Sequence, residues 1–123
     1  LQDLVLQVNN LSGTIPSQIS NLLNLQYLLL DRNHFTGVIP FELGLLNNLK
    51  LLHIAYNELS GLIPATLGNI DSLTSFYCSN NQLIKSIPPE MCNCSKLTTI
   101  DLNNNNMSGT IPPCFGNFPN FTL

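Results

Sequence analysis

The chain has 123 residues and a net charge of −3, and 44% of its residues are hydrophobic while only 9% are charged. The four cationic residues are scattered, so no basic stripe is present to neutralise the phosphates of a nucleic acid. No apolar run approaches the roughly 20 residues that span a bilayer, and we expect neither a signal peptide nor membrane contact from this segment.

An eight-residue phrase recurs every 24 residues along the chain. Its five copies are NNLSGTIP (9–16), NHFTGVIP (33–40), NELSGLIP (57–64), NQLIKSIP (81–88) and NNMSGTIP (105–112). The spacing has no insertion or deletion, and such a fixed period is typical of a repeat protein. We therefore predict one domain over 1–123, with repeats 1–24, 25–48, 49–72, 73–96 and 97–120, and residues 121–123 opening a sixth.

The first part of each repeat, LxxLxL, alternates apolar and variable residues as a half-buried strand does. One such strand per coil would build a parallel sheet, with the fourth and sixth positions of each repeat pointing into the core. The fourth position holds Leu4, Leu28, Leu52, Phe76 and Ile100. The sixth holds Leu6, Leu30, Ile54, Cys78 and Leu102.

An Asn occupies the ninth position of every repeat, where the chain turns off the sheet: Asn9, Asn33, Asn57, Asn81 and Asn105. An Asn side chain both donates and accepts hydrogen bonds, so a column of them can satisfy buried turn groups. Gly and Pro in the phrase then shape the turn. The following xxLGxL portion is expected to return across the opposite side as a short helical turn.

This pattern resembles leucine-rich repeats, and the LSGxIP portion resembles their plant-specific subclass. The resemblance implies an α/β solenoid, a right-handed coil with a concave parallel sheet and a second short strand near SGxIP. Members include ectodomains of receptor-like kinases and receptor-like proteins, and secreted inhibitors of fungal polygalacturonases. Repeat four departs from the pattern because Ile84 and Lys85 replace Ser and Gly, so a distorted turn or an altered second strand is expected there.

Neither end of the sequence shows a capping segment, although solenoids need polar caps over their terminal coils. We expect a piece of a longer solenoid, or ends that a partner covers. Uncapped coils also make end-to-end self-association possible.

Four cysteines are present, and Cys78 and Cys94 fall at inward positions. Cys92 and Cys114 lie on the return side of consecutive coils, where the α-carbons could approach within disulfide range. The MCN…IPPCF spacing also resembles a feature of plant receptor-like proteins. A Cys92–Cys114 disulfide is the favoured reading, with free thiols or a Cys94–Cys114 pair as alternatives.

Four glycosylation sequons occur, at Asn10, Asn93, Asn106 and Asn120. Together with a disulfide they favour an extracellular or cell-surface location. In an Asn-rich chain, accidental sequons are the alternative.

The third, fifth, seventh and eighth positions are expected to point outward on the concave sheet. All three tyrosines of the chain fall in these columns. The candidate ligand-binding patch consists of Tyr27, Leu29, Arg32, Leu51, His53, Tyr56 and Tyr77, with Asp31 beside it. Amphipathic aromatic residues near an Arg are typical interface anchors, although tyrosines also favour sheets for packing alone.

Catalysis finds little support in the sequence. His53 and Asp101 share a column but lie two coils apart, near 10 Å, which is too far for a base and its orienting carboxylate. No phosphate-binding loop, metal cluster or cofactor motif is present.

We therefore expect a non-catalytic module that recognises a protein or peptide through its concave face, as part of a receptor-like ectodomain. The first alternative is a secreted protein that inhibits polygalacturonases. The second is an ice-binding or purely structural repeat protein, which the mixed columns of Tyr, Arg, Asp and Leu disfavour.

Overall fold

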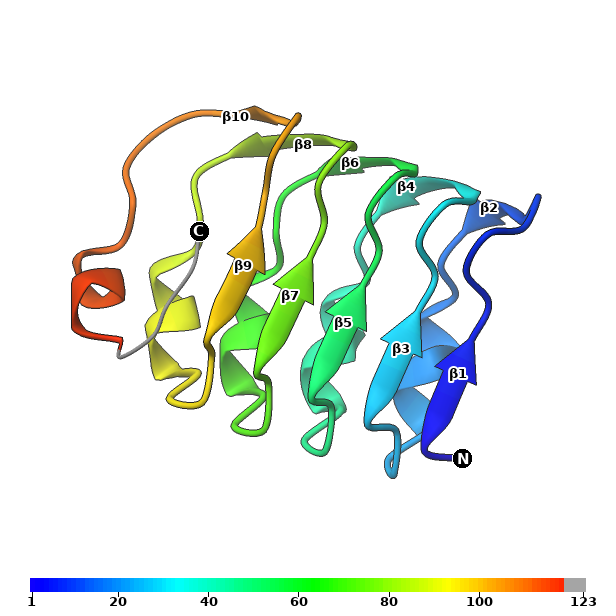
Figure 1. The fold of residues 1–123 in the computed structure, drawn as a ribbon, viewed down its shortest axis with the longest axis horizontal. Coiled ribbons are helices and arrows are strands. Elements are labelled where there is room, and N and C mark those ends of the chain that lie inside the picture. Colours follow the sequence, from blue (N-terminus) through cyan, green and yellow to red (C-terminus); the bar gives the residue numbers. More distant parts are fainter. Residues whose placement is uncertain (119–123) are drawn as a thin grey trace.

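The computed structural model describes residues 1–118, which form five stacked coils of a solenoid (Figure 1). Each coil carries a strand on one side, a second strand along the top of the view and a 3-10 helix on the opposite side. The coils repeat in the 24-residue register that the sequence predicts, because Leu4, Leu28, Leu52, Phe76 and Ile100 are aligned partners across neighbouring strands.

The main sheet contains the first strand of every coil, in the order β1-β3-β5-β7-β9, and all its pairings are parallel. Its strands are β1 (Asp3–Val5), β3 (Tyr27–Leu29), β5 (Leu51–His53), β7 (Ser75–Tyr77) and β9 (Thr99–Asp101). We call its exposed side, turned away from the helices, the strand face; this is the face predicted to be concave.

A second parallel sheet is formed by strands that lie within the phrase of every coil, as the family resemblance implied. Its order is β10-β8-β6-β4-β2. Its strands are β2 (Ser12–Thr14), β4 (His34–Val38), β6 (Glu58–Gly61), β8 (Gln82–Lys85) and β10 (Asn106–Met107).

Short 3-10 helices return the chain on the far side of each coil, which confirms the expected helical turn. They are η1 (Ser17–Asn21), η2 (Phe41–Leu45), η3 (Ala65–Asn69), η4 (Pro89–Asn93) and η5 (Pro113–Asn117). Each follows a proline, and prolines such as Pro40 and Pro64 hold an extended backbone that directs the chain into the first helical residue. No helix within residues 1–118 has the length and hydropathy required to cross a membrane.

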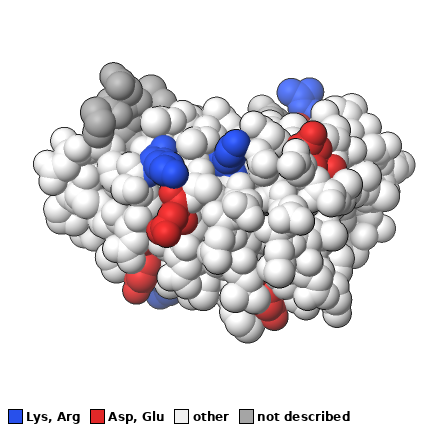
Figure 2. Space-filling model, turned by 90° about the horizontal axis from the view of Figure 1, so that it is seen from below, with Lys and Arg blue, Asp and Glu red and all other residues white. Residues whose placement is uncertain are grey.

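The core lies between the main sheet and the helices. Leu28, Leu52, Phe76 and Ile100 of the fourth column are at most 1% exposed, which confirms the inward direction predicted for them. The helices contribute buried apolar residues from the other side, including Leu43, Leu67 and Met91. The surface seen from below carries few charged side chains, interspersed among uncharged ones (Figure 2).

The expectation of a distorted fourth repeat was wrong. Strand β8 forms and pairs with both β6 and β10. Lys85 adopts the left-handed backbone conformation, with φ of 67°, that Gly61 adopts in the preceding coil with φ of 79°. The turn is therefore preserved by a residue without glycine's conformational freedom.

Candidate functional site

The register of the main sheet aligns the predicted patch residues in two rows across the strand face. Leu29, His53 and Tyr77 are successive partners in one row. Tyr27, Leu51 and Ser75 form the other. Alternation along each three-residue strand turns both rows outward while the residue between them is buried.

The exposure of the patch residues differs along the solenoid. Tyr56 is 50% exposed and Tyr27 is 38% exposed, whereas Leu29, Leu51 and Tyr77 are half-buried. Half-buried apolar side chains can form the floor of a contact surface, and the more exposed tyrosines can reach a ligand above it.

The eighth position of every coil holds a left-handed backbone conformation, which the sequence did not reveal. Its residues Val8, Arg32, Tyr56, Asn80 and Asn104 have φ between 53° and 56°. This conformation is uncommon for residues other than glycine. Two patch residues, Arg32 and Tyr56, thus lie at a fixed bend where each strand leaves the sheet.

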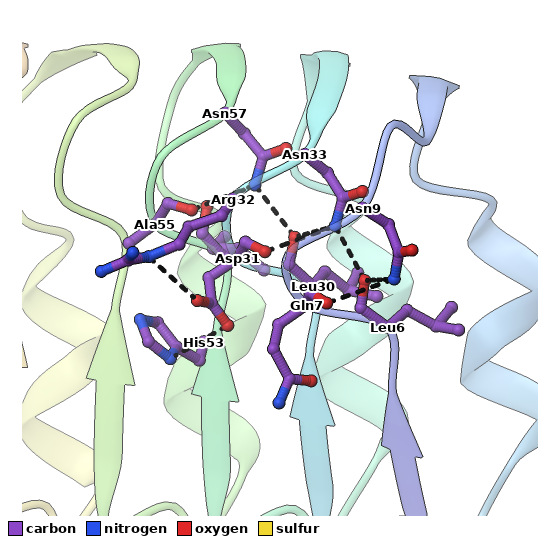
Figure 3. Close-up of polar contacts among 11 residues, drawn as sticks. Leu6, Gln7, Asn9, Leu30, Asp31, Arg32, Asn33, His53, Ala55 and Asn57 are labelled. Carbon is purple, nitrogen blue, oxygen red and sulfur yellow. Dashed lines mark hydrogen bonds and ion pairs between the residues drawn. The ribbon is translucent and has the colours of Figure 1, made fainter.

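The Asn of the ninth position supports this bend through hydrogen bonds to two coils (Figure 3). The Asn57 amide nitrogen donates to the carbonyls of Leu30, Ile54 and Ala55, at 3.1, 3.1 and 3.2 Å. Its side-chain oxygen accepts the backbone N–H of Phe35 at 3.0 Å. Asn33, Asn81 and Asn105 make the same set of contacts in their own coils. The predicted column of turn-satisfying amides is confirmed.

In the three middle coils the seventh position is buried where it was predicted to point outward, whereas Gln7 is half-buried and Asn103 is exposed. Ala55 is 1% exposed, Ser79 is 3% exposed and Asp31 is 6% exposed. The chain bends at the eighth position, so the seventh side chain lies beneath the turn instead of on the open sheet. Asp31 is consequently a buried carboxylate under the strand face.

Asp31 connects two of the predicted patch residues. One carboxylate oxygen, Oδ1, lies 3.3 Å from Nδ1 of His53, and the other, Oδ2, lies 3.9 Å from Nε of Arg32 (Figure 3). The first contact is close but forms no hydrogen bond, so Oδ1 is a buried oxygen without a hydrogen-bond partner among residues 1–118. A buried carboxylate requires compensating charge or hydrogen bonds, and His53 and Arg32 are the groups placed to supply them.

Two ring contacts extend this connection over the face. The imidazole of His53 lies 5.0 Å from the ring of Tyr77, centroid to centroid, at an interplanar angle of 56°. The Arg32 guanidinium lies over the Tyr56 ring, 5.2 Å from its centroid, which is within cation–π range. We call Asp31, Arg32, His53, Tyr56 and Tyr77 the Asp31 cluster.

The structure thus brings four of the seven predicted patch residues into one cluster. Tyr27, Leu29 and Leu51 lie on the same face but make no ring or ionic contact with the cluster. Asp31 was predicted to lie beside the patch, and its pairing with His53 was missed. The signal that could have revealed this pair is an Asp at the seventh position of one coil and a His at the fifth position of the next. His53 pairs with this carboxylate and lies two coils away from Asp101.

Among residues 1–118, no group of three or more His, Cys, Asp or Glu side chains is arranged to hold a metal ion. His34 pairs with Glu58 through Nδ1 and Oε1 at 3.3 Å, in an exposed contact between neighbouring strands of the second sheet. Neither histidine has a nucleophilic thiol or hydroxyl hydrogen-bonded to it within the described chain.

Cys92 and Cys114 form a disulfide between η4 and η5, with their α-carbons 5.8 Å apart. The favoured pairing is therefore confirmed, and Cys78 and Cys94 are buried free thiols. Burial, with a smaller contribution from Asp71, raises the pKa of Cys94 to about 11, so this thiol is a poor nucleophile near neutral pH.

Three of the four predicted glycosylation residues, Asn10, Asn93 and Asn106, are exposed. The fourth, Asn120, lies outside the described residues. Exposure leaves room for a glycan at the first three positions.

A second polar surface lies at the turns of the last two coils. A groove there is lined by the amides of Asn81, Gln82, Asn104, Asn105 and Asn106. Asn104 donates to the side-chain oxygen of Asn80 at 3.0 Å. This surface offers neutral donors and acceptors without a charged group in its lining.

The chain matches two family models that together follow almost its whole length. The model described as Leucine Rich Repeat matches residues 1–22, 24–46 and 48–70, and the model described as Leucine Rich repeats (2 copies) matches residues 71–120. A comparison with curated protein sequences found no match.

Several solved structures are similar over 98% of this chain. The plant peptide hormone receptor RGFR1 in complex with RGF2 is 40% identical, with a TM-score of 0.95. The ectodomain of the receptor kinase GASSHO1/SCHENGEN3 from Arabidopsis thaliana, in complex with CASPARIAN STRIP INTEGRITY FACTOR 2, is 38% identical, with a TM-score of 0.94. The Arabidopsis receptor kinase HAESA, in complex with the peptide hormone IDA and the co-receptor SERK1, is also 38% identical with a TM-score of 0.94. The chain spans only 19%, 14% and 20% of these three structures, respectively.

Proposed function

Since the chain belongs to the leucine-rich repeat family, we propose that it is a non-catalytic recognition module that binds a peptide or protein through its strand face, as part of a receptor-like ectodomain. Similar structures that carry peptide hormones support a peptide ligand. Because those structures are several times longer than this chain, ligand and parent protein are both part of the proposal.

The observation that carries the proposal is the Asp31 cluster. Interface anchors are enriched in Tyr and Arg, and they work best when their conformation is fixed before binding. Here Arg32 is held against Tyr56, and His53 is held between Asp31 and Tyr77. A ligand binding here would therefore immobilise few additional side chains.

A selection from a displayed library of random peptides tests this function directly. We expect peptides to be enriched on the chain and to lose affinity at least about tenfold when Tyr56→Ala and Tyr77→Ala are combined, because both anchors are removed. Phe41→Ala is the matched control, since Phe41 is an aromatic residue that is 64% exposed on η2, away from the strand face.

Circular dichroism and the melting temperature of the double variant establish that it is folded, which partial exposure of both tyrosines favours. Failure to enrich any peptide would overturn the proposal. Equal binding by the folded double variant and the original chain would overturn it as well.

We also propose an extracellular location. A disulfide between two helices and three exposed sequons are typical of chains that fold in an oxidising compartment. Expression through a plant secretory pathway should give a product whose mass falls on treatment with a glycosidase. A product without glycans or with four free thiols would count against this location.

A further inference from the structure

The Arg32 guanidinium is held at its inner edge, the side of Nε, which leaves its outer edge, the two terminal nitrogens, open. Its Nε faces Asp31 at 3.9 Å, and its plane is held near the Tyr56 ring. In Figure 3 the two terminal nitrogens point away from the Asp31 carboxylate. The side chain is 63% exposed, so these nitrogens can be reached from outside.

The charge balance of the cluster favours an anionic partner at this edge. Asp31, the negative member, has only 8% of its side chain exposed, whereas Arg32 displays its positive group at the surface. Within residues 1–118 no other carboxylate pairs with Arg32. Asp101 lies on the same face but three coils away, roughly 14 Å by the spacing of a sheet.

Two terminal nitrogens in one plane form the donor pair that a carboxylate accepts in a two-point contact. We propose that the peptide ligand places the side-chain carboxylate of an acidic residue on the outer edge of Arg32. This inference rests on the proposed function and adds the chemistry of the ligand. Asp31 acts as a positioning residue, because it holds the guanidinium without using its terminal nitrogens.

The surroundings of Arg32 also indicate what should flank the acidic residue. Leu29 and Leu51 are half-buried on neighbouring strands, and Tyr27 borders them. A ligand running along the strand face would therefore place an apolar side chain near these residues when its carboxylate is at Arg32. The recognised segment combines one acidic and one large apolar residue.

A thermodynamic cycle between chain and peptide tests the contact. Peptides selected from the random library are synthesised with an amidated C-terminus, and each acidic residue is replaced by its amide. We expect Arg32→Gln to lower the affinity of the acidic peptide about tenfold or more, as does the Glu→Gln change in the peptide. The two changes together should cost little more than either alone, because they remove the same contact.

Two further variants define the contact. Arg32→Lys keeps the charge but loses the paired donors, and we expect an intermediate affinity. Lys50→Gln removes an exposed positive charge outside the cluster and should leave the affinity unchanged.

The outcomes separate this inference from the function on which it rests. Enriched peptides that need Tyr56 and Tyr77 but neither Arg32 nor an acidic residue would overturn the carboxylate contact and leave the recognition function standing. Binding that requires a free C-terminal carboxylate would likewise overturn the side-chain assignment. Absence of any enriched peptide would overturn both.

Discussion

At the scale of single residues, each turn depends on an eighth-position residue with a strained left-handed backbone and on the ninth-position Asn that supports it. Arg32 and Tyr56 occupy left-handed conformations, with φ of 55° and 53°, which cost side-chain-bearing residues of order 1–2 kcal/mol. The next residues, Asn33 and Asn57, hold these bends through hydrogen bonds to their own and neighbouring coils. The geometry of two proposed ligand contacts is therefore set by residues that do not face the ligand.

Replacing one of these amides should destabilise the chain strongly. Asn57→Ala removes four hydrogen bonds and leaves the Phe35 N–H without its acceptor, so we expect a loss of about 2–4 kcal/mol in unfolding free energy. Urea denaturation measures this loss. Asn10→Ala, an exposed Asn without a side-chain hydrogen bond in the described chain, should change the free energy by less than about 0.5 kcal/mol. Equal effects of the two substitutions would contradict the role assigned to the ninth column.

Lys85 offers the opposite test, in which a substitution should stabilise. Its φ of 67° is one that glycine adopts without steric cost, as Gly61 does one coil earlier. We expect Lys85→Gly to raise the free energy of unfolding by about 0.5–1 kcal/mol, because the relieved strain exceeds the added entropy of the unfolded chain. Lys85→Ala, measured by the same denaturation, should give no such gain. A destabilised glycine variant would show that the Lys85 conformation is not strained.

At the scale of elements, the helices stack at a distance set by one residue. Gly44 and Gly68 occupy the same position in η2 and η3, and an added Cβ would lie far inside contact distance of the Thr66 and Glu90 backbones in the next coil. The corresponding residue in η4 is Cys92, which is bonded to Cys114 of η5. Helix η5 also packs less closely on η4 than η4 packs on η3. The disulfide therefore joins two helices at the position where glycine permits direct packing elsewhere.

Gly68→Ala tests this close approach. The added methyl group would push η4 away from η3, and we expect the unfolding free energy to fall by about 1–3 kcal/mol, as overpacking usually costs. Gly116→Ala is the control at the same position of η5, because nothing lies within 4 Å of the Cβ it would add. Thermal melting of both variants should separate them clearly. Similar melting temperatures would mean that the helices can move apart freely.

At the scale of the whole molecule, each coil contacts only its neighbours, so stability is a sum of coil and interface contributions. The disulfide joins the fourth and fifth coils across a sequence separation of 22 residues. Closing a loop of this size is expected to contribute about 3 kcal/mol.

Replacing Cys92 and Cys114 together by Ser should therefore loosen one end of the solenoid. We expect faster amide hydrogen exchange in residues 97–118, while residues 25–60 keep their protection because their interfaces are unchanged. Exchange measured by mass spectrometry on both proteins gives the comparison. Asn93→Ser, an exposed change in the same helix, should leave both regions protected. Uniformly faster exchange along the chain would instead indicate that the coils unfold as one unit.

The sequence predicted what is repeated better than what varies. The inward columns, the main sheet and the column of ninth-position Asn residues follow from five aligned copies, because a repeated environment requires a repeated residue. The second sheet was implied only by the family resemblance. The burial of Asp31 did not follow, since it depends on the bend at Arg32 that changes the direction of the chain. Lys85 was misjudged for a related reason: the neighbouring strands β6 and β10 impose a geometry that its own propensity disfavours.

The parallel register of the two sheets has a mechanical consequence. Their hydrogen bonds run from coil to coil along the solenoid. A force that pulls the two ends apart therefore acts in series on every interface between neighbouring coils. The chain should then extend in steps of one coil, each releasing about 24 residues, because every interface is opened by peeling rather than sliding. The covalent bond between Cys92 and Cys114 links the fourth and fifth coils, so the interface between these two coils would separate last. The solenoid would therefore extend in a preferred order along its length.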